Sequence, residues 1–315
     1  MTGHHVYPNL DYRLLEALFY ISQTLSFEKA AKKLHITQSA ISQRIKQLEI
    51  QLASKIIVRS TPVSLTPLGE SLVAHYRKIM FLEDQWKSDH LNTLTHKGKV
   101  NLASNRDSLN TWLPKALSLA SHETGTLFEI WAEDQSQTIR LVSSGLVEVC
   151  ISSEKQAVKG YDTVYLGSMD YYCVGTPEFK NKYFHRKKLI DALKQAPATI
   201  FDKHDQVHGI FLEHQLGVPE TDLTFPYHEI PSNHCFVELI LAGQCFGMVP
   251  SHEVRDHLSS GRLIELFPGK RHRVPLYLHS WSYGRAELRQ ITDIFIEAAR
   301  KSLIQPDQNH QDSSG

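Results

Sequence analysis

The chain has 315 residues and a mass of 35.9 kDa, with 41% apolar and 22% charged residues, which predicts about two globular domains and excludes a collagen-like or disordered chain. Its 34 basic and 34 acidic side chains cancel, so any affinity for nucleic acid or a membrane has to be local. No apolar run reaches the length of a membrane span, and the first residues lack the apolar core of a signal peptide. We therefore expect a cytoplasmic protein without membrane contact.

The charge is distributed unevenly along the chain. Residues 1–59 contain eight Lys or Arg and four Asp or Glu, an excess of four positive charges that the remainder of the chain balances. A basic head joined to a mildly acidic body is typical of a DNA-binding domain attached to a sensing domain.

Three helical patterns fill this head. Apolar residues recur at helical spacing over 10–21, Ser26 can cap a second helix over 27–34, and Thr37 can cap a third. The apolar stripe of the third helix consists of Ile41, Ile45, Leu48 and Leu52.

The side of the third helix opposite this stripe is almost entirely polar. Two short helices joined by a tight turn, the second with a hydrogen-bonding outer face, form the helix-turn-helix arrangement that reads the major groove. The alternative is an ordinary three-helix bundle with a solvated face. In the DNA-binding interpretation, the side chains that contact base edges are Gln38, Ser39, Ser42 and Gln43.

A two-stranded wing is predicted after the third helix. Residues 56–58 are β-prone, and the loop that follows contains Pro62 and several hydroxyl groups. Such a wing would lie against phosphates or a minor groove. The expected phosphate contacts are Arg44, Lys46, Arg59, Ser60 and Ser64.

A long helix follows the wing, because Thr66 can serve as its cap and Pro67 as its first residue. Its apolar positions approximate a heptad seam, for which a second copy of the chain is the simplest partner. Packing against its own chain is the alternative. The stripe consists of Leu68, Leu72, Tyr76, Ile79, Leu82 and Trp86.

In the body, β-prone runs alternate with helical patterns, which predicts a parallel sheet and two α/β lobes. The later strands are expected at 171–174, 199–202, 223–227, 246–249 and 276–281. The expected boundaries are 1–66 for the head, 67–90 for the linker helix, 91–98 for a hinge, 99–304 for the body and 305–315 for a disordered tail. Within the body, the first lobe is expected at about 99–167 and 270–304, and the second lobe at about 168–269.

A ligand site is expected where strands end, because ligands of open α/β sheets bind beyond the carboxyl ends of the strands. A basic amino acid fits, since acids would hold its cations while hydroxyls or helix N-termini would hold its carboxylate. Helix capping alone is the alternative for several of these residues. The candidate contacts are Ser104, Asn105, Asp107, Ser108, Glu133, Asp134, Asp202, Asp205 and Ser232.

Little in the sequence indicates a metal, a cofactor or catalysis. His204 and His208 have the spacing of a metal site on one helix face, but no third ligand is specified. Walker, dinucleotide-binding, serine-hydrolase and zinc-protease signatures are absent. We therefore expect no cofactor, no metal site and no enzymatic activity.

The head closely resembles the N-terminal signature of LysR-type transcriptional regulators over about residues 10–90. The body fits that family's periplasmic-binding-protein-like effector domain in length and rhythm. Residues 37–49, 107–113 and 183–184 resemble the branch that senses arginine and lysine, which is also described as inhibiting chromosome replication initiation. A departure is Ala53, where the family often has Gly. The residues that carry the family resemblance are Phe27, Ala30, Ala31, Leu34, 37–42, Ile45, Leu48, Glu49, Arg59 and 65–69.

This resemblance implies an α+β multidomain fold with a winged helix-turn-helix, a dimerising linker helix and a two-lobed α/β effector domain. It implies a sequence-specific transcriptional regulator whose partners are double-stranded DNA, a small effector such as arginine or lysine, RNA polymerase indirectly, and further copies of itself in a homodimer or homotetramer. Two alternatives remain: an architectural or replication-origin DNA-binding protein without a working effector site, and a solute-binding body with an incidental helical head.

Overall fold

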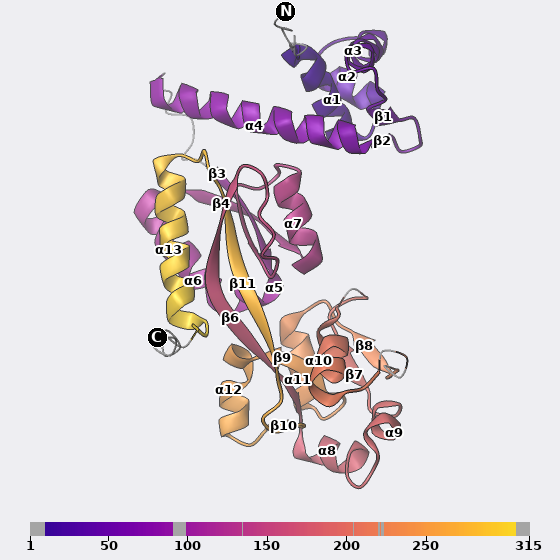
Figure 1. The fold of residues 1–315 in the computed structure, drawn as a ribbon, viewed down its shortest axis with the longest axis vertical. Helices are drawn as coiled ribbons and strands as arrows, with labels where there is room; N and C mark the ends of the chain where they lie inside the picture. The colour runs from indigo at the N-terminus through magenta and orange to yellow at the C-terminus, as the bar shows by residue number, and fades with distance from the viewer. Residues whose placement is uncertain are drawn as a thin grey trace, which may run out of the picture. The chain divides into compact units, whose positions relative to one another are not determined.

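The computed structural model describes residues 10–90, 99–133, 135–203, 205–219, 221 and 224–306. The chain divides into two compact units, Met1–Lys97 with Arg140–Glu148, and Gly98–Ile139 with Val149–Gly315, which we call the head and the body (Figure 1). The expected hinge at 91–98 and residues 307–315 of the expected tail lie outside the described residues.

Three short helices form most of the head, and each begins where a side chain accepts a backbone N–H group. These caps are Asp11, Ser26 and Thr37, of which the last two were predicted. The helices are α1 (Tyr12–Thr24), α2 (Phe27–Lys33) and α3 (Gln38–Gln51).

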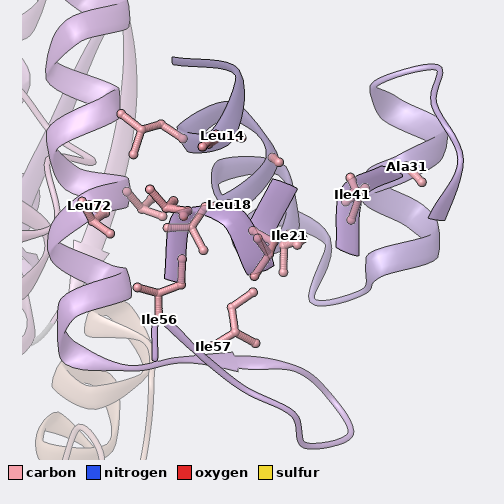
Figure 2. Close-up of a cluster of buried hydrophobic side chains, with 14 residues drawn as sticks. Leu14, Leu18, Ile21, Ala31, Ile41, Ile56, Ile57 and Leu72 are labelled. Carbon is pink, nitrogen blue, oxygen red and sulfur yellow. The ribbon is translucent and has the colours of Figure 1, made fainter. Parts of the chain in front are cut away.

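The core of the head is formed by these helices and by the first turns of the long helix. Ala30 and Ala31 of α2 are buried, and such small side chains allow neighbouring helices to approach closely. The predicted stripe of α3 is buried at Ile41, Ile45 and Leu48. Figure 2 shows how side chains from α1, α3, the wing and the long helix meet in this cluster.

The predicted wing is present. Strands β1 (Ile57–Val58) and β2 (Ser64–Leu65) pair antiparallel, and α4 (Pro67–His90) follows directly. The hydroxyl of Thr66 accepts a hydrogen bond from the N–H of Gly69 at 3.2 Å, as expected of a cap. A Cβ atom at Gly69 would lie 2.1 Å from the carbonyl oxygen of Ile56, so glycine is required for α4 to approach the wing.

A mixed sheet forms the centre of the body, with the strand order β10-β6-β11-β5-β3-β4 and with β9 paired to β6. The first three strands are parallel, as predicted. Two long antiparallel strands, β6 and β11, extend through both lobes (Figure 1). The strands of this sheet are β3 (Lys99–Asn105), β4 (Leu127–Glu133), β5 (Val149–Ser152), β6 (Tyr161–Gly175), β9 (Gly247–Pro250), β10 (Ile264–Glu265) and β11 (Arg271–Trp281).

Helices cover this sheet in both lobes. In the first lobe α6 and α13 lie side by side (Figure 1). The ring of Phe295 in α13 lies 6.1 Å from that of Phe128 in β4. The second lobe has its own apolar core, centred on Phe236, Ile240 and Val249. The helices of the body are α5 (Arg106–Asn110), α6 (Leu113–Thr124), α8 (Pro177–Tyr183), α9 (Leu189–Leu193), α10 (Val207–Leu216), α11 (Asn233–Leu241), α12 (Ser251–Ser259) and α13 (Ala286–Ser302). Helix α7 (Gln135–Ser143) begins in the body, and its residues from Arg140 onward group with the head.

Three strand predictions need correction. The strand expected at 276–281 is β11, which begins at Arg271, because its first three residues are charged or polar and do not form an apolar run. Strand β6 begins at Tyr161 rather than at residue 171, because its first part alternates polar and apolar residues without a continuous apolar run. The strand expected at 223–227 is β8 (Tyr227–Glu229), which pairs parallel with β7 (Ala198–Ile200). Pro226 has no N–H group to donate to a ladder, so pairing starts after it. Leu223 lies outside the described residues.

The end of α3 places a non-glycine residue in the left-handed region. Ala53 has φ 48°, the N–H of Ser54 donates to the carbonyl of Glu49 at 3.1 Å, and the N–H of Ala53 donates to that of Ile50 at 3.2 Å. These two bonds form the helix-terminating arrangement in which glycine is preferred. The departure from the family noted in the sequence therefore carries a conformational cost.

We expect Ala53→Gly to raise the free energy of unfolding of the head by about 1 kcal/mol, because glycine adopts positive φ without steric strain. Hydrogen exchange of the α3 amides in the full chain measures this change. As a matched control, Ala40→Gly within α3 lowers the free energy of unfolding by about 0.5–1 kcal/mol. Lower protection of α3 in Ala53→Gly would contradict the interpretation.

Candidate functional site

The outer face of α3 is available to solvent. Gln38, Ser39, Gln43 and Lys46 are exposed, and Ser42 is half-buried. The opposite face is anchored in the core of the head. Within the head, this arrangement presents side chains that donate and accept hydrogen bonds over the length of a recognition helix.

The residues predicted to contact phosphates differ in their exposure and in the contacts that they already make within the head. Arg44 is half-buried, and its guanidinium lies 3.4 Å from the carbonyl oxygen of Arg13 and 4.0 Å from the carboxylate of Glu16, so it ties α3 to α1. Arg59 and Ser64 on the wing are exposed. Also exposed, Ser60 donates its hydroxyl to the carbonyl oxygen of Pro62 at 2.6 Å, a bond within the wing loop.

The apolar stripe of α4 is divided in two. Leu72 is buried and Tyr76 half-buried against the core of the head, where the ring of Tyr76 lies 5.7 Å from that of Phe19. Towards the end of the helix, Leu82 is 47% and Trp86 57% exposed. The middle of the stripe therefore packs on its own chain, while Leu68 at its start is 39% exposed and its last part remains uncovered within the head.

A cavity of about 360 Å³ lies between the two lobes of the body. Residues that directly follow β3, β5 and β7 line it, together with the end of β9 and the first turns of α10, α11 and α12. The long strands contribute Tyr171 from β6 and His272 from β11. The cavity is therefore located at the carboxyl ends of strands, where ligands of such sheets bind.

Four of the nine predicted contacts line this cavity: Asn105, Asp107, Asp202 and Asp205. Three do not. Ser104 and Ser108 are buried elsewhere, and Ser232 caps α11 by accepting a 3.5 Å hydrogen bond from the N–H of Cys235. The side chain of Glu133 and all of Asp134 lie outside the described residues.

The cavity is strongly acidic. Among the described residues that line it, Arg106 is the only lysine or arginine. Burial lowers the pKa of His272, which keeps its imidazole neutral near pH 7. The lining carboxylates are Asp107, Glu154, Asp202, Asp205 and Glu253.

The pKa values of Asp107 and Glu253 are raised by burial and by neighbouring carboxylates. Removal from water raises the pKa of Asp107, and the charge of Asp205 raises it further. The hydrogen bond that its carboxylate accepts from the hydroxyl of Tyr171 lowers the pKa in part. Burial and the charge of Asp107 raise the pKa of Glu253 to about 7. Asn233 opposes this rise by donating a 3.1 Å hydrogen bond to Glu253 Oε1.

Asn105 has an unusual position at the end of β3. The residue lines the cavity and is 3% exposed, and its Nδ2 and Oδ1 atoms are buried without a hydrogen-bond partner among the described residues. Buried amide groups are normally paired, so this amide is a polar group beside the cavity that the protein's own contacts do not satisfy.

Sequence reasoning missed several lining residues, including Tyr171 and Glu253. Glu253 follows a strand that was predicted, at 246–249, so the same strand-end rule could have selected it. No sequence signal marks Tyr171, because it lies inside a strand and enters the cavity only through the crossing of β6 between lobes.

The metal alternative gains no support in the described residues. His208 is buried, and its Nε2 atom accepts a 3.2 Å hydrogen bond from the N–H of Met248. His204 lies outside the described residues. Within the part of the chain that the structure describes, no group of three His, Cys, Asp or Glu side chains is arranged to hold a metal ion.

The head and the body each match a known protein family. Residues 12–70 match the bacterial regulatory helix-turn-helix proteins of the lysR family, and residues 95–301 match the LysR substrate binding domain. The chain therefore belongs to the LysR family and is a DNA-binding transcriptional regulator with a winged helix-turn-helix head and a two-lobed effector domain. Its described helices include none that is both long and apolar enough to cross a membrane.

Known regulators of this family are similar to the chain over nearly its full length. The HTH-type transcriptional regulator ArgP of Vibrio parahaemolyticus is 35% identical over 94% of this chain and 99% of its own. The regulator of the same name from Proteus mirabilis is 36% identical over 95% of this chain and 99% of its own.

Solved structures agree with this grouping. The crystal structure of ArgP from Mycobacterium tuberculosis superposes with a TM-score of 0.82 at 26% identity, covering 95% of this chain and 100% of that one. Full-length LysG from Corynebacterium glutamicum, with arginine bound as effector, superposes with a TM-score of 0.78 at 28% identity, covering 94% of this chain and 100% of that one.

We expect two neighbouring polar residues of the body to differ in their contribution to stability. Ser108→Ala costs about 1–3 kcal/mol of unfolding free energy, because Ser108 accepts a 3.1 Å hydrogen bond from the buried Nε1–H of Trp112. Asn105→Ala, which breaks no hydrogen bond between side chains, costs less than about 1 kcal/mol. Denaturant unfolding followed by tryptophan fluorescence compares them, and equal losses would show that Asn105 is paired within the protein.

Proposed function

We propose that the body cavity binds a basic amino acid, arginine or lysine, and that its occupancy alters how the head binds DNA. The observation that carries this proposal is the excess of carboxylates among the described residues that line the cavity, which include a single arginine. Such a site is complementary to a small cation. The arginine reported in LysG, which shares the fold at 28% identity, supports the same class of ligand.

Each part of the ligand has a proposed partner. The charge of Asp205 acts on Asp107, and that of Asp107 on Glu253, so a ligand ammonium or guanidinium group beside these carboxylates would relieve their repulsion. Asp202 provides a further carboxylate. The unpartnered amide of Asn105 would donate and accept hydrogen bonds with the same ligand.

On the head, the exposed face of α3 supports direct reading of bases. We assign base contacts to Gln38, Ser39, Ser42 and Gln43, whose amide and hydroxyl groups match the donors and acceptors of the major groove. Phosphate contacts are assigned to Arg44, Lys46, Arg59, Ser60 and Ser64. For Arg44 this requires release of its contacts with Arg13 and Glu16.

The proposed assembly is a homodimer or homotetramer that acts on DNA in the cytoplasm and affects RNA polymerase through its DNA site. The uncovered end of the α4 stripe, Leu82 and Trp86, is the proposed contact between two linker helices. Leu72 and Tyr76 are already packed within the head, so they would shape this contact only indirectly.

Footprinting of the full chain on genomic DNA, with and without arginine or lysine, tests the proposed function. We expect specific protection whose extent or affinity changes with the amino acid. Specific protection that ignores both amino acids would favour an architectural DNA-binding protein, and absence of specific protection would favour a solute-binding body. Either result would contradict the proposal.

Two substitutions on α3 separate the reading of bases from attraction to phosphates. Gln43→Ala is expected to change sequence preference by about 1–3 kcal/mol, because an amide can contact a base edge in two places. Lys46→Ala is expected to weaken all sequences alike and to reduce the salt dependence of binding by about one phosphate contact. Binding assays at two salt concentrations with specific and altered sites measure both effects. If the two variants behaved identically, this division of roles would be wrong.

Affinity for the amino acid is expected to fall as the pH falls below about 7, the pKa of Glu253 in the empty cavity. A bound cation favours the ionised carboxylate, so at lower pH binding must first remove a proton, which weakens affinity by up to about tenfold per pH unit. Calorimetry of arginine between pH 8 and pH 6 measures this trend.

Glu253→Gln should flatten the trend and weaken binding at pH 8. The exposed lining carboxylate Glu154 offers a matched control, since Glu154→Gln should retain the pH dependence. A pH dependence that survives in Glu253→Gln would exclude Glu253 as its source.

A further inference from the structure

Arg106 connects the two lobes across the cavity. It begins α5 in the first lobe, and its guanidinium carbon lies over the ring of Phe201, 4.3 Å from the ring centroid. Its Nη1 atom is 3.6 Å from Oδ2 of Asp202. Phe201 and Asp202 directly follow β7 in the second lobe, and all three residues line the cavity.

This local environment is the one that a basic ligand requires. An aromatic face beside a carboxylate attracts a guanidinium or ammonium group through the ring quadrupole and through charge. In the structure the protein's own arginine occupies it, and the side chain is only partly exposed, at 31%. A ligand cation and Arg106 cannot both occupy this place.

We propose that Arg106 is an internal substitute for the effector cation: it occupies the Phe201–Asp202 subsite in the free protein, is displaced by the side-chain cation of the effector, and then pairs with the effector α-carboxylate. This inference rests on the proposed function, because it names how the same cavity distinguishes ligands. Arg106 is thus a specificity-determining residue as well as a link between the lobes.

With this exchange, the cavity binds a basic amino acid in preference to a simple amine. A basic amino acid supplies a cation that replaces Arg106 and a carboxylate that receives the displaced guanidinium, which binds carboxylates in a bidentate manner. A decarboxylated analogue supplies the cation alone. It displaces Arg106 from Phe201 and Asp202 but supplies no carboxylate for the displaced guanidinium, so the complex has one charge pair fewer than with the amino acid.

The body contains a matched arginine outside the cavity. Arg271 lies over the ring of Tyr172, 4.6 Å from its centroid, and 4.0 Å from the carboxylate of Asp170. It therefore has the same types of partner as Arg106 but does not line the cavity. Arg271→Gln serves as the control for removing a stacked arginine from the body.

The test measures, by calorimetry, the affinity of the full-length chain for L-arginine and for agmatine, which is arginine without its carboxylate. The proteins are the unsubstituted chain, Arg106→Gln and Arg271→Gln, and thermal unfolding establishes that each variant is folded. We expect Arg106→Gln to bind agmatine about tenfold more tightly than the unsubstituted chain does, because the competing cation is gone.

In the same variant, the preference for L-arginine over agmatine should shrink by at least about tenfold, because the carboxylate has lost its partner. Arg271→Gln should change neither value. Agmatine binding that is unchanged or weaker in Arg106→Gln overturns the inference. If the unsubstituted chain fails to bind both L-arginine and, in a parallel titration, L-lysine, the proposed function is wrong, whereas tighter agmatine binding by Arg106→Gln would still support the displaceable arginine. Absence of binding by every protein overturns both.

Discussion

The excess of negative charge inside the body cavity is the constraint on which the proposed activity of this protein depends. Carboxylates removed from water are costly unless they are paired, hydrogen-bonded or protonated. The structure shows one response of each kind: Arg106 beside Asp202, the Tyr171 hydroxyl donating to Asp107, and a raised pKa at Glu253. Each response is incomplete on its own. A small cation satisfies several carboxylates at once, which gives ligand binding its driving force.

In the head, the two faces of α3 lie in different environments, one in the core and the other in solvent. Ile41, Ile45 and Leu48 fix α3 in the core, and this anchoring leaves its amide and hydroxyl side chains on the outside. Rigid support matters because base contacts require side chains at defined positions. The absence of a side chain at Gly69 allows α4 to approach the wing closely.

Sequence patterns predicted the head better than the body. In the head, helical periodicity, the caps Ser26 and Thr37 and the Pro67 start are local signals, and the structure contains all of them. In the body, β6 was recognised only in its last part, because a strand that crosses between lobes changes its surroundings along its length. Pro226 shifted β8 for a local reason that could have been read from the sequence.

The cavity shows the same contrast between local and long-range information. The strand-end rule selected Asn105, Asp107, Asp202 and Asp205, which line one cavity, since the rule depends only on where strands stop. It also selected Ser108 and Ser232, which instead accept hydrogen bonds from Trp112 and from the first turn of α11. Whether a strand-end serine faces a cavity or a neighbouring backbone is decided by tertiary packing, which no single segment encodes.

The most direct test of a cavity built for a cation is to compare L-arginine with L-citrulline, whose side chain has nearly the same shape but carries no charge. Isothermal titration of each into the full-length chain at pH 8 isolates the contribution of that charge. We expect arginine to bind about 10- to 100-fold more tightly, the range expected for hydrogen bonds between charged groups. Equal affinities, or a preference for citrulline, would contradict the view that the carboxylates of the cavity select its ligand.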